Sequence, residues 1–171
     1  MKSFLRRAYH FAVALLAACW YRFPSRRLTV IGVTGTKGKT TTVELAAWLC
    51  ESAGIPVAAL SSVHESMRGA RRRNTTGNSM PGRFALQSFF ARAVKSGATH
   101  AIVEVTSQGV LFHRHRFIRW AFGAATNIAP EHIEAHGSFV AYREAKTSFL
   151  RMVVRQGGRV FLNQDDQASE Y

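Results

Sequence analysis

The sequence has few cysteines, few acidic residues and no apolar run of transmembrane length, and each scarcity excludes a class of protein. Two cysteines, Cys19 and Cys50, are too few for a disulfide framework or a four-ligand zinc site. The apolar, uncharged run at 11–21 has 11 residues, whereas a membrane-spanning helix needs about 20. We therefore expect a chain that folds around its own core in a reducing, cytoplasmic setting.

The 171 residues are 47% hydrophobic and 19% charged, which is typical of a single globular domain. Lysine and arginine number 23 against 10 acidic residues, so the formal net charge is +13. The arginines form three groups: Arg6, Arg7, Arg22, Arg26 and Arg27; Arg68 and 71–73; and Arg114, Arg116 and Arg119. Such patches suit phosphates, nucleic acid or an anionic membrane, and charge alone does not choose among these partners.

The apolar run at 11–21 has arginines on both sides and is open to three interpretations. Leu16 to Cys19, after a basic start, resemble a lipoprotein signal. A helix with basic flanks, and with Trp20 and Tyr21 at its edge, would instead lie on a membrane surface. In the third interpretation the helix packs on the domain that follows. The cytosolic ligand predicted below argues against the signal.

After Pro24, short β-branched runs alternate with longer helical patterns. Strands are predicted at 28–33, 55–61, 100–105, 122–126 and 159–162, and helices at 39–53, 83–96 and 139–155. The polar stretch 63–82 is predicted to be a long loop. This alternation indicates an α/β fold with a parallel sheet. We expect one domain over 28–171, preceded by an apolar and basic helix within 1–27.

The strongest motif lies between a predicted strand and a predicted helix and reads Gly35-Thr36-Lys37-Gly38-Lys39-Thr40-Thr41. Glycines let backbone N–H groups turn toward phosphate oxygens, and the amino-terminal end of the helix adds its positive dipole. Lys39 would reach the β- and γ-phosphates, and the Thr40 hydroxyl would bind Mg²⁺. The motif therefore predicts an ATP and Mg²⁺ site. A glycine-rich turn without a ligand is the alternative.

Three further observations limit the classes of phosphate-loop protein to which this sequence could belong. Val33 stands where the general motif has its first glycine. The Asn-Lys-x-Asp with which GTPases read their base is absent from the sequence. The predicted strand HAIVEV carries Glu104 where such strands usually end in aspartate, and a glutamate also holds Mg²⁺.

Four segments in one order resemble the central ATP-binding domain of the Mur ligases: VTGTKGKTTT, EVTSQG, TNIAPEHIEAHGS and YREAK. Their order and spacing are most similar to the MurE-type branch, which adds the third residue of the peptidoglycan stem peptide. The resemblance runs from about Val30 to the carboxyl end and implies a three-layer, P-loop NTPase-like domain that is incomplete here. In that family ATP and a terminal carboxylate form an acyl phosphate, and an amine then displaces phosphate to give an amide.

The resemblance also implies roles for individual residues around ATP. Lys39 and Thr40 would bind the triphosphate and the first Mg²⁺, and Glu104 would bridge the metals. His132 and Lys146 would hold the second metal, with Lys146 carbamylated.

On the substrate side, the resemblance implies that Thr106, Ser107 and Arg114 contact a UDP-MurNAc-peptide-like substrate. The chain departs from the MurE-type pattern in two places. Ser79-Met80-Pro81 stands where that branch has Thr-Thr-Pro, and Phe112 replaces a polar residue that contacts the substrate.

Lys146 stands out even without the family. If the segment after Ser138 is a helix, Lys146 shares its face with Tyr142, Phe149, Leu150 and Val153. A lysine in an apolar stripe is desolvated, which lowers its pKa and leaves an amine able to take up CO₂. The alternative is a lysine that reaches solvent from the edge of a packed face.

Other histidines and arginines have simpler interpretations. His132 and His136 are four apart, but the glutamate between them is one place late for the zinc-protease pattern. His113 and His115 alternate with arginines and are expected to face solvent or substrate. The arginine run at 68–73 is expected to be a solvated loop.

Two functions are consistent with these patterns. The first is the ATP-binding portion of a Mur-type amide ligase of peptidoglycan synthesis, at the cytoplasmic side of the membrane. The second is a basic P-loop module that binds nucleic acid, the less favoured ligand, or anionic membrane without ligase chemistry. Full ligases of the family have three domains, and this chain ends at Tyr171 inside the central one. We therefore expect the chain alone to bind nucleotide weakly and to form no amide.

Overall fold

The computed structural model describes residues 2–129 and 137–166, with side chains from Leu5 onward. Its helices are α1 (Lys2–Trp20), α2 (Lys39–Ser52), α3 (Arg83–Lys95), α4 (Ser107–Leu111) and α6 (Phe139–Arg155), and a 3₁₀ turn, η1, spans Pro24–Arg27. Its strands are β1 (Thr29–Thr34), β2 (Val57–Leu60), β3 (His64–Met67), β4 (Ala70–Arg73), β5 (His100–Glu104), β6 (Trp120–Ala125) and β7 (Arg159–Leu162).

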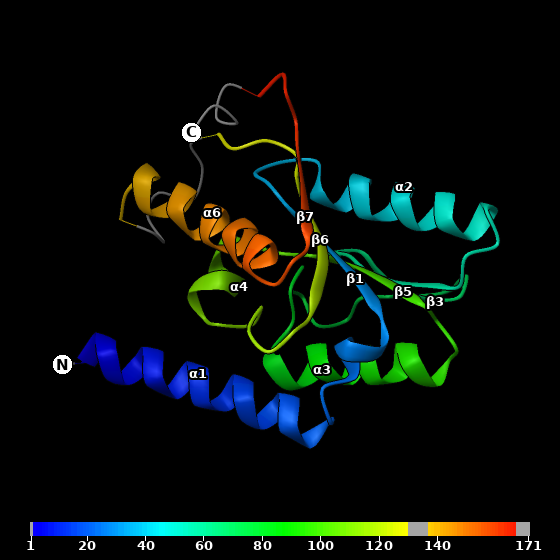
Figure 1. Cartoon of the computed structure of the whole chain (residues 1–171), viewed down its shortest axis with the longest axis horizontal. Coiled ribbons are helices and arrows are strands. Elements are labelled where there is room, and N and C mark those ends of the chain that lie inside the picture. The colour runs from blue at the N-terminus through cyan, green and yellow to red at the C-terminus, as the bar shows by residue number, and fades with distance from the viewer. Residues whose placement is uncertain (1, 130–136, 167–171) are drawn as a thin grey trace.

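The strands form one sheet in the order β4-β3-β2-β5-β1-β6-β7 (Figure 1). From β2 to β7 neighbouring strands are parallel, as the alternation of strands and helices predicts. The strand before the phosphate loop, β1, therefore lies centrally, between β5 and β6. The carboxyl ends of these three strands share one edge of the sheet, which is where ligands bind in open α/β sheets.

The prediction of a loop across 63–82 is wrong for its first half, because His64–Arg73 form an antiparallel hairpin on β2. A two-residue turn joins its strands, and both turn residues, Arg68 and Gly69, have positive φ angles of 51° and 84°. Two positive φ angles match the twist of a hairpin. All of β4 is exposed, so its sequence lacks the apolar alternation by which strands are recognised.

Helices cover both faces of the sheet. Along β2 and β5 the side chains alternate between two clusters, as expected for strands that are buried on both faces. Ala58, Leu60, Ala101 and Val103 join α3 and α6, whereas Val57, Ala59 and Ile102 join α2. These layers confirm the predicted three-layer α/β class.

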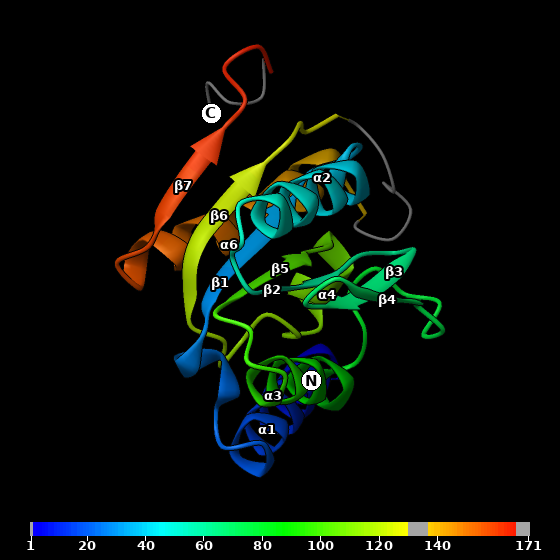
Figure 2. The ribbon, with the colours of Figure 1, turned by 90° about the vertical axis from the view of Figure 1, so that its right-hand side faces the viewer.

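The amino-terminal helix α1 lies outside these layers, against α3 (Figure 2). It is attached by small residues, because Ala14, Ala17 and Ala18 are buried whereas Leu16 and Trp20 are exposed. This arrangement is the one that the third interpretation of the apolar run predicts. No helix among the described residues has the length and apolar character needed to cross a membrane.

The prediction that His115 faces solvent or substrate is wrong. His115 is buried, with 4% of its surface exposed, and its ring lies edge-on to Phe149 of α6 at 6.5 Å. Burial is the main cause that lowers the pKa of His115 to about 3, helped by the charge of Arg116. His115 is therefore a neutral core residue rather than a solvent-facing one.

Candidate functional site

The phosphate loop leaves β1 at Thr34 and enters α2 at Lys39, as predicted. Gly35 has a φ of 143°, and a Cβ atom built on it would lie 1.9 Å from Thr126 Oγ1. Glycine is therefore required at position 35 by both its backbone angle and its neighbour. The helix begins after Gly38, so its first N–H groups face the space enclosed by the loop.

Thr126 and Asn127, which begin the segment TNIAPEHIEAHGS and directly follow β6, hold the loop from that side. Thr36 N–H donates to the carbonyl oxygen of Asn127 at 2.8 Å, and Lys37 N–H donates to its Oδ1 at 3.0 Å. In return, Thr126 Oγ1 donates to the carbonyl oxygen of Lys37 at 2.6 Å. The sequence marks these two residues as part of that segment and as the end of a strand, but it does not predict that they contact the loop. These bonds fix the shape of the loop.

Two lysines meet at the base of the loop. Lys39 Nζ donates to the carbonyl oxygens of Gly35 and Thr36 at 2.9 and 2.8 Å. Lys146 Nζ donates to the same Gly35 oxygen at 2.5 Å. Lys146 is 1% exposed and lies over the ring of Tyr142 at 4.6 Å. The apolar stripe predicted for α6 therefore buries Lys146 and brings it to the phosphate loop, which excludes the solvent-reaching alternative.

An oxygen-rich group lies on the other side of the loop. Thr40 Oγ1 donates to Glu104 Oε1 at 2.8 Å, and Ser62 N–H donates to the same oxygen at 2.7 Å. Glu104 is 1% exposed at the end of β5. Hydroxyl and carboxylate oxygens are the ligands that Mg²⁺ prefers, so Thr40 and Glu104 fit the predicted metal. Ser62 was not predicted.

Several predicted residues share one cavity of about 250 Å³ in front of the loop. Its lining includes Lys39, Thr106, Ser107, Arg114 and Lys146. Three of these five are basic, and none of the residues that line the cavity in the described part of the chain is acidic. The cavity is therefore suited to an anion.

Arg114 reaches this cavity from the segment after α4 and donates to the carbonyl oxygen of Met80. Burial lowers the pKa of Arg114. Its Nε atom is buried and has no hydrogen-bond partner among the described residues. Thr106 has a structural role as well, because its Oγ1 accepts from Gly109 N–H at 3.0 Å and caps α4.

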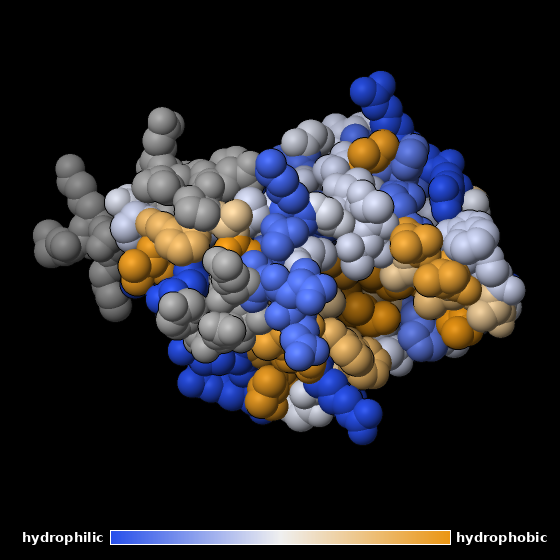
Figure 3. Space-filling view, turned by 90° about the horizontal axis from the view of Figure 1, so that it is seen from above, coloured by the Kyte–Doolittle hydropathy of each residue, from blue (hydrophilic) through white to orange (hydrophobic). Residues whose placement is uncertain are grey.

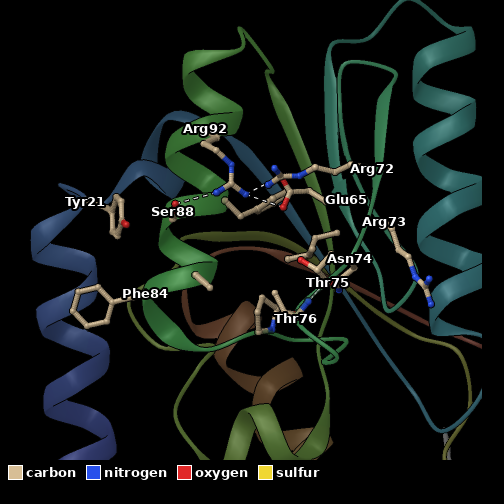
Figure 4. Close-up of a pocket in the computed structure, with 14 residues that line it drawn as sticks. Tyr21, Glu65, Arg72, Arg73, Asn74, Thr75, Thr76, Phe84, Ser88 and Arg92 are labelled. Carbon is tan, nitrogen blue, oxygen red and sulfur yellow. Dashed lines mark hydrogen bonds and ion pairs between the residues drawn. The ribbon is translucent and has the colours of Figure 1, made fainter.

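A second cavity of about 420 Å³ lies between α3 and the hairpin, and sequence analysis did not predict it (Figure 4). Glu65 is at its centre and accepts from Arg72 Nη2 and Arg92 Nη2, both at 2.7 Å. The expectation that 68–73 is a loop is thus wrong for its backbone, whereas Arg72 stays solvated, with 63% of its side chain exposed, while it pairs with Glu65. Arg73 points away from the ion-paired group. Asn74 to Thr76 line this cavity, and the residues that follow, 77–80, line the first one.

His132 and His136 lie outside the described residues. Among the described residues, no group of three or more histidine, cysteine, aspartate or glutamate side chains is placed to hold a metal.

Comparison with known proteins identifies the family of the chain. A model of the Mur ligase middle domain family matches residues 33–171. The chain belongs to the Mur ligase family. The UDP-N-acetylmuramoyl-L-alanyl-D-glutamate--2,6-diaminopimelate ligase of Chlamydia felis is 32% identical over 158 residues, which are 92% of this chain and 32% of that protein. The chain spans about a third of the length of the curated relatives it matches.

Solved structures agree with this assignment. A diaminopimelate ligase of the same name shares 28% identity with a TM-score of 0.70, over 84% of this chain and 28% of that one. A Mycobacterium tuberculosis folylpolyglutamate synthase complexed with ADP and AMPPCP shares 15% identity with a TM-score of 0.70, over 91% of this chain and 47% of that one. This second likeness shows that the same fold occurs outside the Mur ligases.

Proposed function

We propose that this chain is the ATP-binding part of an ATP-dependent ligase that joins an amino acid to a peptidoglycan precursor. The observation that carries the proposal is the cavity in which Lys39 of the phosphate loop faces Thr106, Ser107 and Arg114. A reaction between ATP and a carboxylate needs both reactants in one such place. Relatives named for adding diaminopimelate to a UDP-MurNAc dipeptide support the substrate class.

The proposed reaction has two steps. A carboxylate oxygen of the UDP-MurNAc-peptide attacks the γ-phosphorus of ATP, and ADP leaves. The amine of the incoming amino acid then attacks the acyl carbon, the nitrogen loses a proton, and inorganic phosphate leaves. Both reactants of the first step are anions, so positive charge around them lowers the barrier. Lys39 and the loop N–H groups would bind the phosphates, and Arg114 would orient the carboxylate substrate.

Thr40 and Glu104 are the residues that would hold the first Mg²⁺, and Glu104, His132 and a carbamylated Lys146 the second. When bound, these ions neutralise the phosphate charge. The folylpolyglutamate synthase structure, complexed with ADP and AMPPCP, supports nucleotide binding by this fold. ATP as a reactant also supports a cytoplasmic location.

Titration with Mg²⁺-ATP, followed by tryptophan fluorescence, tests the nucleotide site. We expect weak, metal-dependent binding by the 171-residue chain, and at least a tenfold weaker affinity in Lys39→Ala, because a charge-assisted contact to phosphate is lost. Lys95→Ala is the matched control, since Lys95 is exposed at the far end of α3. Equal affinity in the two variants, or binding that ignores Mg²⁺, would contradict the proposal. Amide formation by the chain alone would contradict the expectation that it does not ligate.

A further inference from the structure

The outward face of α1 is apolar along its whole described length, which is unusual for a helix at the surface of a protein. At 100° per residue, the face opposite the buried Ala14, Ala17 and Ala18 carries Leu5, Ala8, Ala12, Leu15, Leu16 and Cys19. Tyr9 and Trp20, 63% and 74% exposed, flank this face. The helix forms the outermost layer of the molecule (Figure 1), so the described part of the chain leaves the face uncovered.

Positive charge lies near both ends of α1 but not on this face, because at 100° per residue Arg6 and Arg7 fall on the side of the helix that carries Ala14 and Ala17. Six basic residues precede β1: Lys2, Arg6, Arg7, Arg22, Arg26 and Arg27. The first acidic residue of the whole chain is Glu44. The helix therefore combines an apolar outer face with cationic ends and has no carboxylate of its own to neutralise them.

A second exposed apolar patch, on α2, lacks this combination. Viewed from above, apolar side chains gather over α2 (Figure 3), where Leu45, Trp48 and Leu49 are each 54% exposed. That helix carries Glu44 and Glu51, and Arg71 lies within 4 Å of both carboxylates. The patch on α2 thus lacks the uncompensated cations that accompany the face of α1.

We propose that α1 binds the surface of an anionic membrane, with its outer face in the acyl boundary and with the basic residues near its two ends adding electrostatic attraction to the lipid phosphates. Leucines suit the acyl boundary, and tyrosine and tryptophan suit the headgroup level. Each basic side chain near an anionic surface adds to the attraction. A second copy of the chain fits less well, because two such helices laid face to face would bring cationic ends together in either direction.

This inference is independent of the proposed ligase reaction, since α1 contributes no described residue to the phosphate-loop cavity. The direct test is co-sedimentation of the 171-residue chain with vesicles of phosphatidylcholine alone and of phosphatidylcholine mixed with phosphatidylglycerol. We expect binding to the mixed vesicles, weakening as salt is raised, and little binding to phosphatidylcholine. No binding to mixed vesicles, or equal binding to both, would overturn the proposal.

Two matched pairs of variants locate the contact. Leu16→Glu should weaken binding by roughly tenfold or more, because it places an anion on the membrane face. Leu49→Glu makes the same change at a similarly exposed leucine of α2 and should bind as the wild type does. The pair Arg6→Gln and Arg27→Gln should lose roughly tenfold. Arg155→Gln with Arg159→Gln removes the same net charge from exposed positions elsewhere and should lose little.

Circular dichroism and thermal unfolding establish that each variant is folded. Equal losses in Leu16→Glu and Leu49→Glu would overturn the proposal, because the apolar face of α1 would then not be the contact. So would a dimer in gel filtration that Leu16→Glu dissociates, since the face would belong to a second copy.

Discussion

Lys39 and Lys146 share one hydrogen-bond acceptor, the carbonyl oxygen of Gly35, although one lysine begins α2 and the other lies within α6. If both amines were protonated, two ammonium groups at one oxygen would repel each other. Either an anion between them or a change in the charge of one lysine relieves that repulsion. Carbamylation of Lys146 would change its charge in this way, because it would replace a cation with an anion beside the remaining cation, Lys39.

From this arrangement we expect any carbamylation of Lys146 to depend on Lys39. In ¹³C-bicarbonate, we expect a carbamate carbon signal by NMR in the wild type and none in Lys146→Met. Lys39→Met should reduce the signal, because a neighbouring positive charge stabilises the carbamate anion. Lys95→Met, at the far end of α3, should leave the signal unchanged. A full signal in Lys39→Met would show that the two lysines are not coupled.

Glu104→Gln should separate metal binding from folding. The glutamine oxygen can still accept from Thr40 Oγ1 and Ser62 N–H, so we expect similar stability to urea. The lost negative charge should weaken the Mg²⁺-dependent part of ATP binding by about tenfold or more. Glu144→Gln is the control, because the Glu144 side chain is 64% exposed on α6. ATP binding with an unchanged Mg²⁺ dependence in Glu104→Gln would remove Glu104 from the metal site.

Gly35→Ala should destabilise the chain by about 2–5 kcal/mol, through both a positive φ and the collision with Thr126. Gly54 is a control for the cost of the positive φ alone. It has a φ of 73°, and a Cβ atom added to it would meet nothing within 4 Å. Gly54→Ala should therefore cost only about 1–2 kcal/mol. Urea unfolding measures both values, and equal costs would mean that the contact with Thr126 relaxes.

His115 should make the chain less stable as pH falls. Its pKa is about 3 in the folded chain and about 6.5 when unfolded, so between these values only the unfolded chain binds the proton. The stability that this group contributes is complete above about pH 6.5 and is lost toward about pH 3, at about 1.4 kcal/mol per pH unit. The difference in unfolding free energy between the wild type and His115→Asn should change with that slope. A constant difference would contradict the burial of a neutral His115.

Those parts of the site that depend on one continuous segment could be predicted from the sequence. The phosphate loop, the position of Glu104 at the end of a strand, and the apolar stripe around Lys146 each follow from local spacing. The clamp formed by Thr126 and Asn127 depends on β6 lying beside β1, which local spacing does not contain. The same holds for Ser62, which meets Glu104 only because β2 pairs with β5.

Other features were missed because their local signals are weak or misleading. The hairpin strand β4 consists mostly of exposed arginines, whose polarity resembles that of a loop. His115 lies between two arginines, yet the turn after α4 directs it inward against Phe149. In both cases tertiary packing, and not local composition, determines the structure: β4 is a strand because it pairs with β3, and His115 is buried because it packs against Phe149.

The two edge strands of the sheet, β4 and β7, differ in how readily they would pair with an additional strand. At one edge β4 presents three consecutive arginines, so a copy of the same edge would bring like charges together and resist pairing. At the other edge β7 presents Phe161 and Leu162, 60% and 52% exposed. A second copy of this sheet is therefore more readily joined at the β7 edge than at the β4 edge.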